Sequence, residues 1–230
     1  MTTRRTDWIP WAVLGGLGLL GVAVLAVPTA RRALLLPEVR MPNPPESFTP
    51  TGPRQTEYRT PAEARAALGE LGRYFSWDES GVWPRNGAPI PHQVALAMVE
   101  TARTYLDVLR AAHGPIVVTS WYRPRDYNMT VSGASDTSMH PTGYAVDFYF
   151  RNHRNGFKGA EDVASTLAAR NVPWDQVIGY ETGTHRMHLG ARYHDGGYRM
   201  LVQQHRPGRA GTDYPVVARY RSGGGGIALA

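Results

Sequence analysis

The stretch Ser138-Met139-His140-Pro141-Thr142-Gly143-Tyr144-Ala145-Val146-Asp147 places a histidine and an aspartate seven residues apart, with a short turn between them. Residues 138–142 have the composition of a turn, and the run Tyr144–Phe150 is rich in residues that favour β-strands. We therefore expect His140 in the loop that enters a strand and Asp147 within that strand. Because imidazole and carboxylate groups are common zinc ligands, this spacing predicts that both side chains converge on one ion.

A catalytic zinc site also needs a third protein ligand and an open position for water. The segment His185-Arg186-Met187-His188 can supply that third ligand. The chain contains no cysteine, so any zinc must be held by histidine and carboxylate side chains. An ionised Asp147 next to Val146 and Phe148 would be costly to bury alone, and a metal partner removes that cost.

The pattern S-x-H-x-x-G-x-A-x-D in the opening stretch resembles the zinc motif of the M15-type D-alanyl-D-alanine peptidases and murein endopeptidases. Other segments resemble further parts of this superfamily in the same order along the chain. They are Tyr74–Glu79 ("F-S-x-x-E"), Pro115–Arg123 ("P-I-x-I-T-S-G-Y-R"), Asn128 with residues 131–134, and Asp175–Glu181 with His188 ("D-Q-L-I-x-E … H"). The resemblance covers roughly residues 74–192 and implies a zinc peptidase with His140, Asp147 and His188 as ligands.

The resemblance also implies a role for Arg123. Arg123 follows an apolar strand, where its planar guanidinium can clamp a peptide carboxylate; the alternative is a salt bridge to Asp126 or Asp136. We expect Ser138 to brace the metal-binding loop through a hydrogen bond, next to the substrate. Trp121 stands where relatives have glycine, which predicts a crowded or reshaped substrate groove.

Two residues are candidates for the general base that handles protons during hydrolysis. Glu181 resembles the family glutamate near the end of its strand, and His185 lies three residues before His188, where other relatives carry glutamate. A carboxylate and an imidazole can both transfer protons near neutral pH, so the sequence leaves both residues open.

The segment Trp8–Ala30 contains no charged residue and is long enough, as a helix, to cross a membrane core of about 30 Å. Arginine pairs flank it on both sides, so the charge rule does not orient it. A murein-cleaving domain must lie outside, so we expect a single-pass anchor in the cell membrane with a periplasmic or extracellular C-terminal domain. The alternative is a signal peptide cleaved near Ala30.

The remaining chain divides into a stalk, a domain and a tail. Six prolines between Leu36 and Arg59 predict an extended stalk over residues 33–59, following the cytoplasmic tip and anchor over residues 1–32. We expect an M15-like zinc peptidase domain over residues 60–221 and a flexible glycine-rich tail over 222–230. Within the domain, hydrophobic patterning predicts helices at 61–73, 91–112 and within 159–171, and strands at 116–120, 144–150, 176–180, 186–191 and 198–203. This order predicts an α+β fold, a small antiparallel sheet packed with helices around the zinc site.

These features together predict a membrane-anchored zinc peptidase that hydrolyses peptide bonds in peptidoglycan stem peptides or cross-links, with Zn²⁺ as cofactor. The alternative is a non-catalytic, zinc-stabilised domain that binds cell wall or a protein partner. The four arginines and Asp7 that flank the apolar segment together contribute +3 to the net charge of +6, and no basic stripe with interleaved aromatics predicts nucleic-acid binding. The sequence makes no prediction of oligomeric state or of carboxypeptidase against endopeptidase activity.

Overall fold

The computed structural model describes residues 57–229, except 133, 182–184, 194–196, 209–210, 214 and 221–227. Side chains are not described at 206–208, 211–213 and 228–229. The predicted anchor and nearly all of the predicted stalk lie outside the described residues. Within the described part of the chain, no helix has the length and apolar character needed to span a membrane.

The folded domain begins before residue 60. Strand β1 (Glu57–Tyr58) pairs with β2 (Ile90–Pro91), and Tyr58 is buried, with its hydroxyl 2.6 Å from Nδ1 of His92. The last residues of the predicted stalk therefore belong to the domain. At the other end, the predicted tail includes β10 (Ala228–Leu229), which pairs with β9 (Val216–Arg219).

Helix α1 (Pro61–Leu68) begins as predicted and ends earlier than predicted. The Thr60 hydroxyl accepts a hydrogen bond from the Glu63 backbone N–H at 3.2 Å, and the Glu63 carboxylate accepts from the Arg59 N–H at 2.7 Å. Thr60 therefore caps the helix, although Glu63 reaches one residue further back than in the usual capping box. The helix stops at Gly69, whose φ of +71° is easily reached only by glycine.

The second predicted helix is one continuous rod with a defect in its middle. It consists of α2 (His92–Thr101), the π-helical turn η1 (Ala102–Leu106) and α3 (Asp107–His113). Gly114, with φ of +86°, ends it. Helix α4 (Arg125–Thr130) and the 3₁₀ turn η2 (His140–Thr142) were not predicted, because both are shorter than two helical turns and show no repeating pattern.

Within the described residues, eight strands form the main sheet in the order β10-β9-β7-β5-β6-β4-β3, with β8 paired to β7. The strands not yet given are β3 (Ile116–Ser120), β4 (Ala145–Phe150), β5 (Gln176–Tyr180), β6 (Met187–Gly190), β7 (Leu201–Gly208) and β8 (Gly211–Asp213). The α+β class is confirmed. The sheet is mixed rather than purely antiparallel, because β7 returns beside the start of β5 and runs parallel to it.

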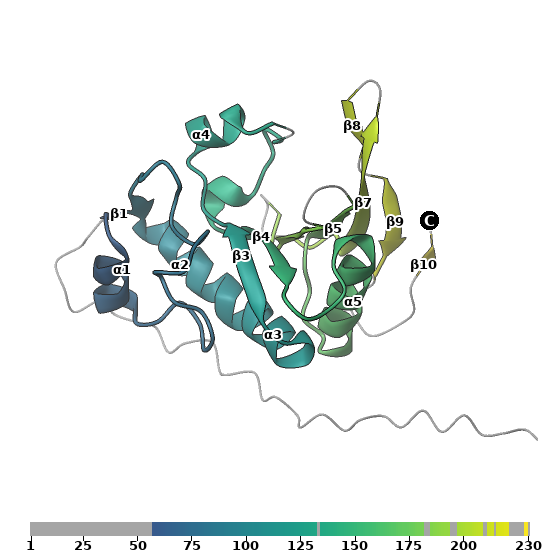
Figure 1. Ribbon diagram of the computed structural model, residues 1–230, viewed down its shortest axis with the longest axis horizontal. Coiled ribbons are helices and arrows are strands. Elements are labelled where there is room, and N and C mark those ends of the chain that lie inside the picture. The colour runs from purple at the N-terminus through teal and green to yellow at the C-terminus, as the bar shows by residue number, and fades with distance from the viewer. Residues whose placement is uncertain are drawn as a thin grey trace, which may run out of the picture. The chain divides into compact units, whose positions relative to one another are not determined.

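Helix α5 (Gly156–Ala169) covers one face of this sheet, and the loop with α4 and η2 lies above the other (Figure 1). A Cβ added at Gly179 would meet the Phe157 backbone of α5 at 2.3 Å, and one at Gly159 would meet Met187 Sδ at 2.6 Å. Gly179 and Met187, which pair across β5 and β6, therefore face α5. Side chains alternate along a strand, so their neighbours Ile178 and His188 face the opposite side.

The core contains the large buried side chains Trp77, Trp121 and Trp174. Trp121 is fully buried, and its indole N–H donates to the Gly143 carbonyl at 2.9 Å. The prediction that Trp121 crowds a substrate groove is therefore wrong: its side chain faces the core.

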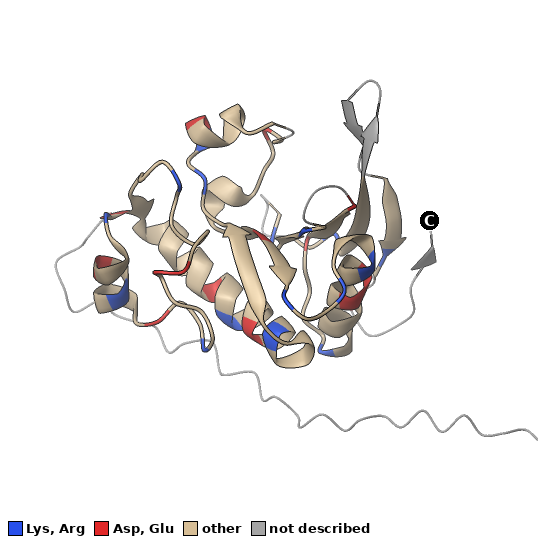
Figure 2. Ribbon diagram, in the orientation of Figure 1, with Lys and Arg blue, Asp and Glu red and all other residues tan. Residues whose placement is uncertain are grey.

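Helices α3 and α5 carry acidic and basic side chains in mixed order, as expected for solvated faces (Figure 2).

Candidate metal centre

The first predicted ligand, His140, is held by the turn that precedes β4. Its side chain is 2 % exposed, and Nδ1 lies 2.6 Å from the Trp121 carbonyl oxygen. A carbonyl only accepts hydrogen bonds, so Nδ1 carries the proton and Nε2 keeps its lone pair. The Ser138 hydroxyl accepts from the His140 backbone N–H at 3.3 Å, which fixes the turn as the sequence predicts.

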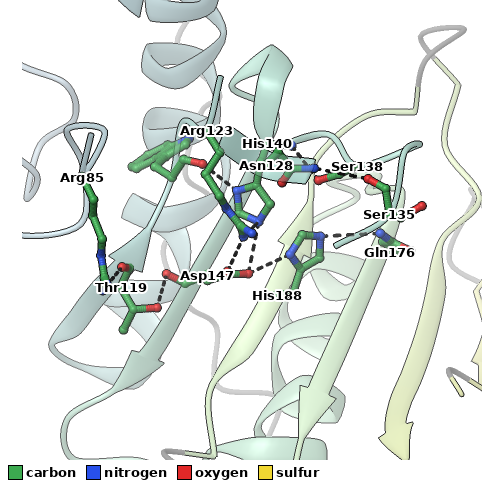
Figure 3. A network of polar contacts seen from close by, with 11 residues as sticks. Arg85, Thr119, Arg123, Asn128, Ser135, Ser138, His140, Asp147, Gln176 and His188 are labelled. Atoms are coloured by element: carbon green, nitrogen blue, oxygen red, sulfur yellow. Dashed lines mark hydrogen bonds and ion pairs between the residues drawn. The ribbon is translucent and has the colours of Figure 1, made fainter. Parts of the chain in front are cut away.

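Asp147 and His188 come from neighbouring strands, directly opposite each other in the register of β4 and β6. Asp147 Oδ1 lies 2.8 Å from His188 Nδ1 and 3.3 Å from His140 Nε2. One ligand atom from each of the three residues lies within 4.8 Å of the others (Figure 3). The structure thus brings the three predicted ligands together in a buried cluster.

Burial and charge set the protonation states of this cluster. Burial lowers the pKa of His140 below its ordinary value, so the ring is neutral near pH 7. Burial alone would raise the pKa of Asp147, but the adjacent His140 and His188 side chains hold it well below its ordinary value. A neutral imidazole and an ionised carboxylate are the states that bind a metal.

Arg123 is also part of the cluster. One guanidinium nitrogen lies 2.6 Å from Asp147 Oδ2 and also contacts His140 Nε2. Asp147 and His140 thus direct an ionised oxygen and an imidazole lone pair at one positively charged group. The predicted alternatives, salt bridges from Arg123 to Asp126 or Asp136, are not among its contacts in the described structure. The donor set fits Zn²⁺, which takes histidine nitrogen and carboxylate oxygen ligands.

The three ligands and Arg123 line a pocket of about 460 Å³ on the face of the sheet away from α5. One wall comes from the loop after α4 and carries hydroxyl groups, including those of Ser132, Ser135 and Ser138. The other described lining residues come from β5, β6, β7 and the segments beside them: Gln176, Ile178, Tyr180, Arg186, Arg199, Gln203 and His205. Gln176 also approaches the ligand ring, with its amide nitrogen 3.5 Å from His188 Nε2.

Neither predicted general base lines this pocket. The Glu181 carboxylate accepts from the Phe157 N–H at 2.6 Å, at the start of α5, and its second oxygen lies 3.8 Å from His185 Nδ1. Both side chains are about half exposed. His185 has φ of +49°, in the left-handed region, at the point where the chain enters β6. The geometry therefore gives no support to Glu181 or His185 as the base.

Strand alternation explains why the Glu181 side chain lies on the face of the sheet away from the pocket. In the motif D-Q-L-I-x-E, the glutamate falls five residues after the aspartate, which is the position of Tyr180 when Asp175 is the first residue. Tyr180 faces the pocket, and Glu181 faces α5. An offset of one residue in a strand moves a side chain to the other face of the sheet.

The family model for peptidase M15 matches residues 73–189, half of the chain, and this range contains all three clustered ligands. The chain belongs to the peptidase M15 family. Comparison with curated proteins and with solved structures gave no match. As an M15 peptidase the protein is a metallopeptidase of a zinc-dependent family, and its His-His-Asp cluster is the site that suits the metal.

The sequence also contained a signal for pocket residues that we did not predict. Alternation from His188 along β6 places Arg186 on the same face, and alternation along β5 places Gln176, Ile178 and Tyr180 there. Strand alternation does not predict that His205 lines the pocket. His205 enters the pocket because β7 pairs in parallel with β5, opposite Tyr180, and that pairing has no signature in the sequence.

Proposed function

We propose that this M15 peptidase hydrolyses peptide bonds in peptidoglycan stem peptides or cross-links that contain D-amino acids. The observation that carries the proposal is the convergence of His140, Asp147 and His188 in a buried cluster that opens to a pocket. A structural zinc site is closed by protein ligands, whereas a catalytic site keeps a position open. Three clustered ligands beside a pocket favour the catalytic arrangement.

Each residue has a defined task in this proposal. His140 and His188 each supply a ring nitrogen, and Asp147 supplies an ionised oxygen, to hold Zn²⁺. Zinc would supply Lewis-acid polarisation of the scissile carbonyl and a more acidic water. The Trp121 carbonyl holds His140 in the required tautomer. Arg123, already at the ligand atoms, is placed to bind a carboxylate or carbonyl of the peptide, and Ser138 lines the pocket beside it.

We also propose that the domain acts outside the cell, attached to the membrane by a helix over Trp8–Ala30. The support is the uncharged length of this segment and the location of the murein substrate. The proline-rich residues 33–56 would act as a spacer between the membrane and the domain.

A second candidate function is a zinc-stabilised domain that binds cell wall or protein without catalysis. One observation favours it: Glu181 and His185 both lie away from the pocket, and Asp147 is the only carboxylate among the described lining residues. Both candidate functions require bound zinc, but only the peptidase hydrolyses a substrate.

Incubating the zinc-loaded, full-length chain in detergent with purified murein and with stem peptides separates the two candidates. Mass spectrometry of the products identifies both the bond cleaved and the class of peptidase. The catalytic proposal expects products that lack one D-amino acid or one cross-link, and no products with the Asp147→Asn variant. Tight murein binding without new products would instead support the non-catalytic domain.

A further inference from the structure

The pocket beside the metal ligands has an excess of positive charge. Among its described lining residues, the arginines are Arg123, Arg186 and Arg199, and the only acidic residue is Asp147. Asp147 pairs with Arg123, and the buried Asp175 takes two hydrogen bonds from Arg199, at 2.6 and 2.8 Å. The third arginine, Arg186, forms no ion pair with an acidic side chain of the described residues.

Arg186 is exposed, and both its side chain and its backbone contact Tyr180 of β5. Its guanidinium carbon lies 5.2 Å from the centre of the Tyr180 ring, in a cation–π contact. The His205 ring lies 4.8 Å from the same ring, and Tyr180 and His205 are partners in the parallel register of β5 and β7. The Arg186 backbone is fixed as well, because its carbonyl accepts from the Tyr180 N–H at 3.0 Å.

The strand registers place Arg186 relative to the metal ligands. Arg186 lies two residues before His188 on the same face, which is about 7 Å along the strand. Arg123 follows β3, whose end lies beside Asp147 and the start of β4. Ser120, the last residue of β3, and His188 of β6 both pair with Asp147, and both strands run antiparallel to β4. The segment after β3, which carries Arg123, and the segment before β6, which carries Arg186, therefore leave the level of Asp147 in opposite directions. The two arginines therefore approach the cluster from opposite directions.

We infer that Arg186, supported by Tyr180 and His205, forms a subsite for a second carboxylate of the substrate, about one to three residues from the cleaved bond. This inference rests on the proposed peptidase function and narrows its substrate class to acidic peptides. A guanidinium binds a carboxylate through two parallel hydrogen bonds, and the pocket wall carries hydroxyl groups, which can hydrogen-bond the polar backbone of a peptide. A neutral amide in place of that carboxylate loses the charge-assisted part of the interaction.

The test uses the full-length, zinc-loaded chain and a set of synthetic peptides with a terminal D-amino acid. Each peptide carries one carboxylate at the first, second or third residue before the cleaved bond, and each has a partner in which that carboxylate is a primary amide. At one position we expect kcat/KM to favour the carboxylate peptide by about tenfold or more, mainly through KM. Arg186→Gln should remove this preference, and Arg186→Lys should keep part of it.

Arg151→Gln is the matched control, because Arg151 is exposed, directly follows β4 and does not line the pocket. It should keep the preference of the parent, and all variants should keep equal zinc content. Equal kcat/KM for every carboxylate and amide pair in the parent would overturn the inference and leave the peptidase function standing. A preference that survives Arg186→Gln would also overturn it.

Binding measurements cover the case in which the parent does not hydrolyse any peptide, which would refute the proposed function. Calorimetric titration of the zinc-loaded parent should then still show tighter binding of the carboxylate peptide than of its amide. Arg186→Gln should abolish that difference. Equal affinity for the two peptides would overturn the subsite without reference to turnover.

Discussion

At the scale of single residues, the metal cluster depends on the orientation of His140. The Trp121 carbonyl fixes the proton on Nδ1, which leaves Nε2 free to face Asp147. A hydrogen bond of this kind to the second ring nitrogen sets the tautomer and orientation of a metal-binding histidine. The tryptophan thus acts on the site through its backbone, while its side chain packs in the core.

Arg123→Lys should weaken peptide hydrolysis more than zinc binding. A lysine ammonium keeps the positive charge near Asp147 but cannot form the two parallel hydrogen bonds of a guanidinium. We expect zinc content to stay at the parent level and kcat/KM to fall by about tenfold or more on peptides with a free terminal carboxylate. Unchanged kinetics on such peptides would show that Arg123 has only a structural role.

Glu181→Ala should lower stability and leave turnover intact. The Glu181 carboxylate accepts from the Phe157 N–H at the start of α5, so its loss should cost about 0.5–2 kcal/mol of unfolding free energy, as for a helix cap. Chemical denaturation and peptide kinetics measure the two effects. Glu161→Ala is the control and should change stability less, because the half-exposed Glu161 carboxylate pairs with the exposed Lys158 side chain and not with a backbone N–H. A loss of 100-fold or more in turnover with zinc retained would restore Glu181 as the general base.

At this scale, the sequence predicted the three ligands as a cluster, with Arg123 and Ser138 beside them, but not the pocket residues of β5, β7 and the segments next to these strands. The spacing of His140 and Asp147 in one local motif predicted their convergence, and the resemblance to M15 peptidases selected His188 as the third ligand. The geometry gives no support to Glu181 as the base because its carboxylate contacts the start of α5, and composition alone does not distinguish positions 180 and 181 in a strand. Strand alternation, counted back two residues from His188, could have predicted that Arg186 lies on the pocket face of the sheet.

At the scale of elements, the position of the cluster depends on close packing between α5 and the sheet. Gly179 of β5 lets the Phe157 backbone approach so closely that any side chain would collide with it. Most element positions followed from hydrophobic periodicity, and β3 and β5 have the predicted bounds. Hydrophobic periodicity did not predict the π-helical turn η1 or the parallel pairing of β7, because both depend on tertiary packing rather than on local pattern.

Gly179→Ala should therefore destabilise the fold strongly, whereas Gly190→Ala should be mild. A Cβ at Gly179 would meet the Phe157 backbone at 2.3 Å, but one at Gly190 would meet only a side-chain atom, Cγ of Gln176, at 3.2 Å. We expect the first change to cost at least about 1–3 kcal/mol, from overpacking, and the second to cost less. Thermal unfolding of both variants checks this. Equal melting temperatures would contradict the described packing of α5 on β5.

At the scale of the whole molecule, we propose that an extracellular domain is attached to a membrane anchor. We expect Trp8 to about Pro28 to be an uncleaved transmembrane helix, because the segment is uncharged and long enough to span. Protease added to intact spheroplasts should degrade the C-terminal domain, and a cytoplasmic marker protein should survive. Survival of the domain would contradict the orientation, and a mature N-terminus near Ala30 would establish a cleaved signal peptide instead.

The central claim is that one Zn²⁺ is held by His140, Asp147 and His188, and metal analysis of the purified full-length chain tests it most directly. We expect one zinc per chain in the parent and in His185→Ala, whose side chain is exposed and lies outside the pocket. We expect zinc to be lost in His188→Ala, three residues further along, with circular dichroism confirming that the variant is folded. Full zinc stoichiometry in folded His188→Ala would contradict the account.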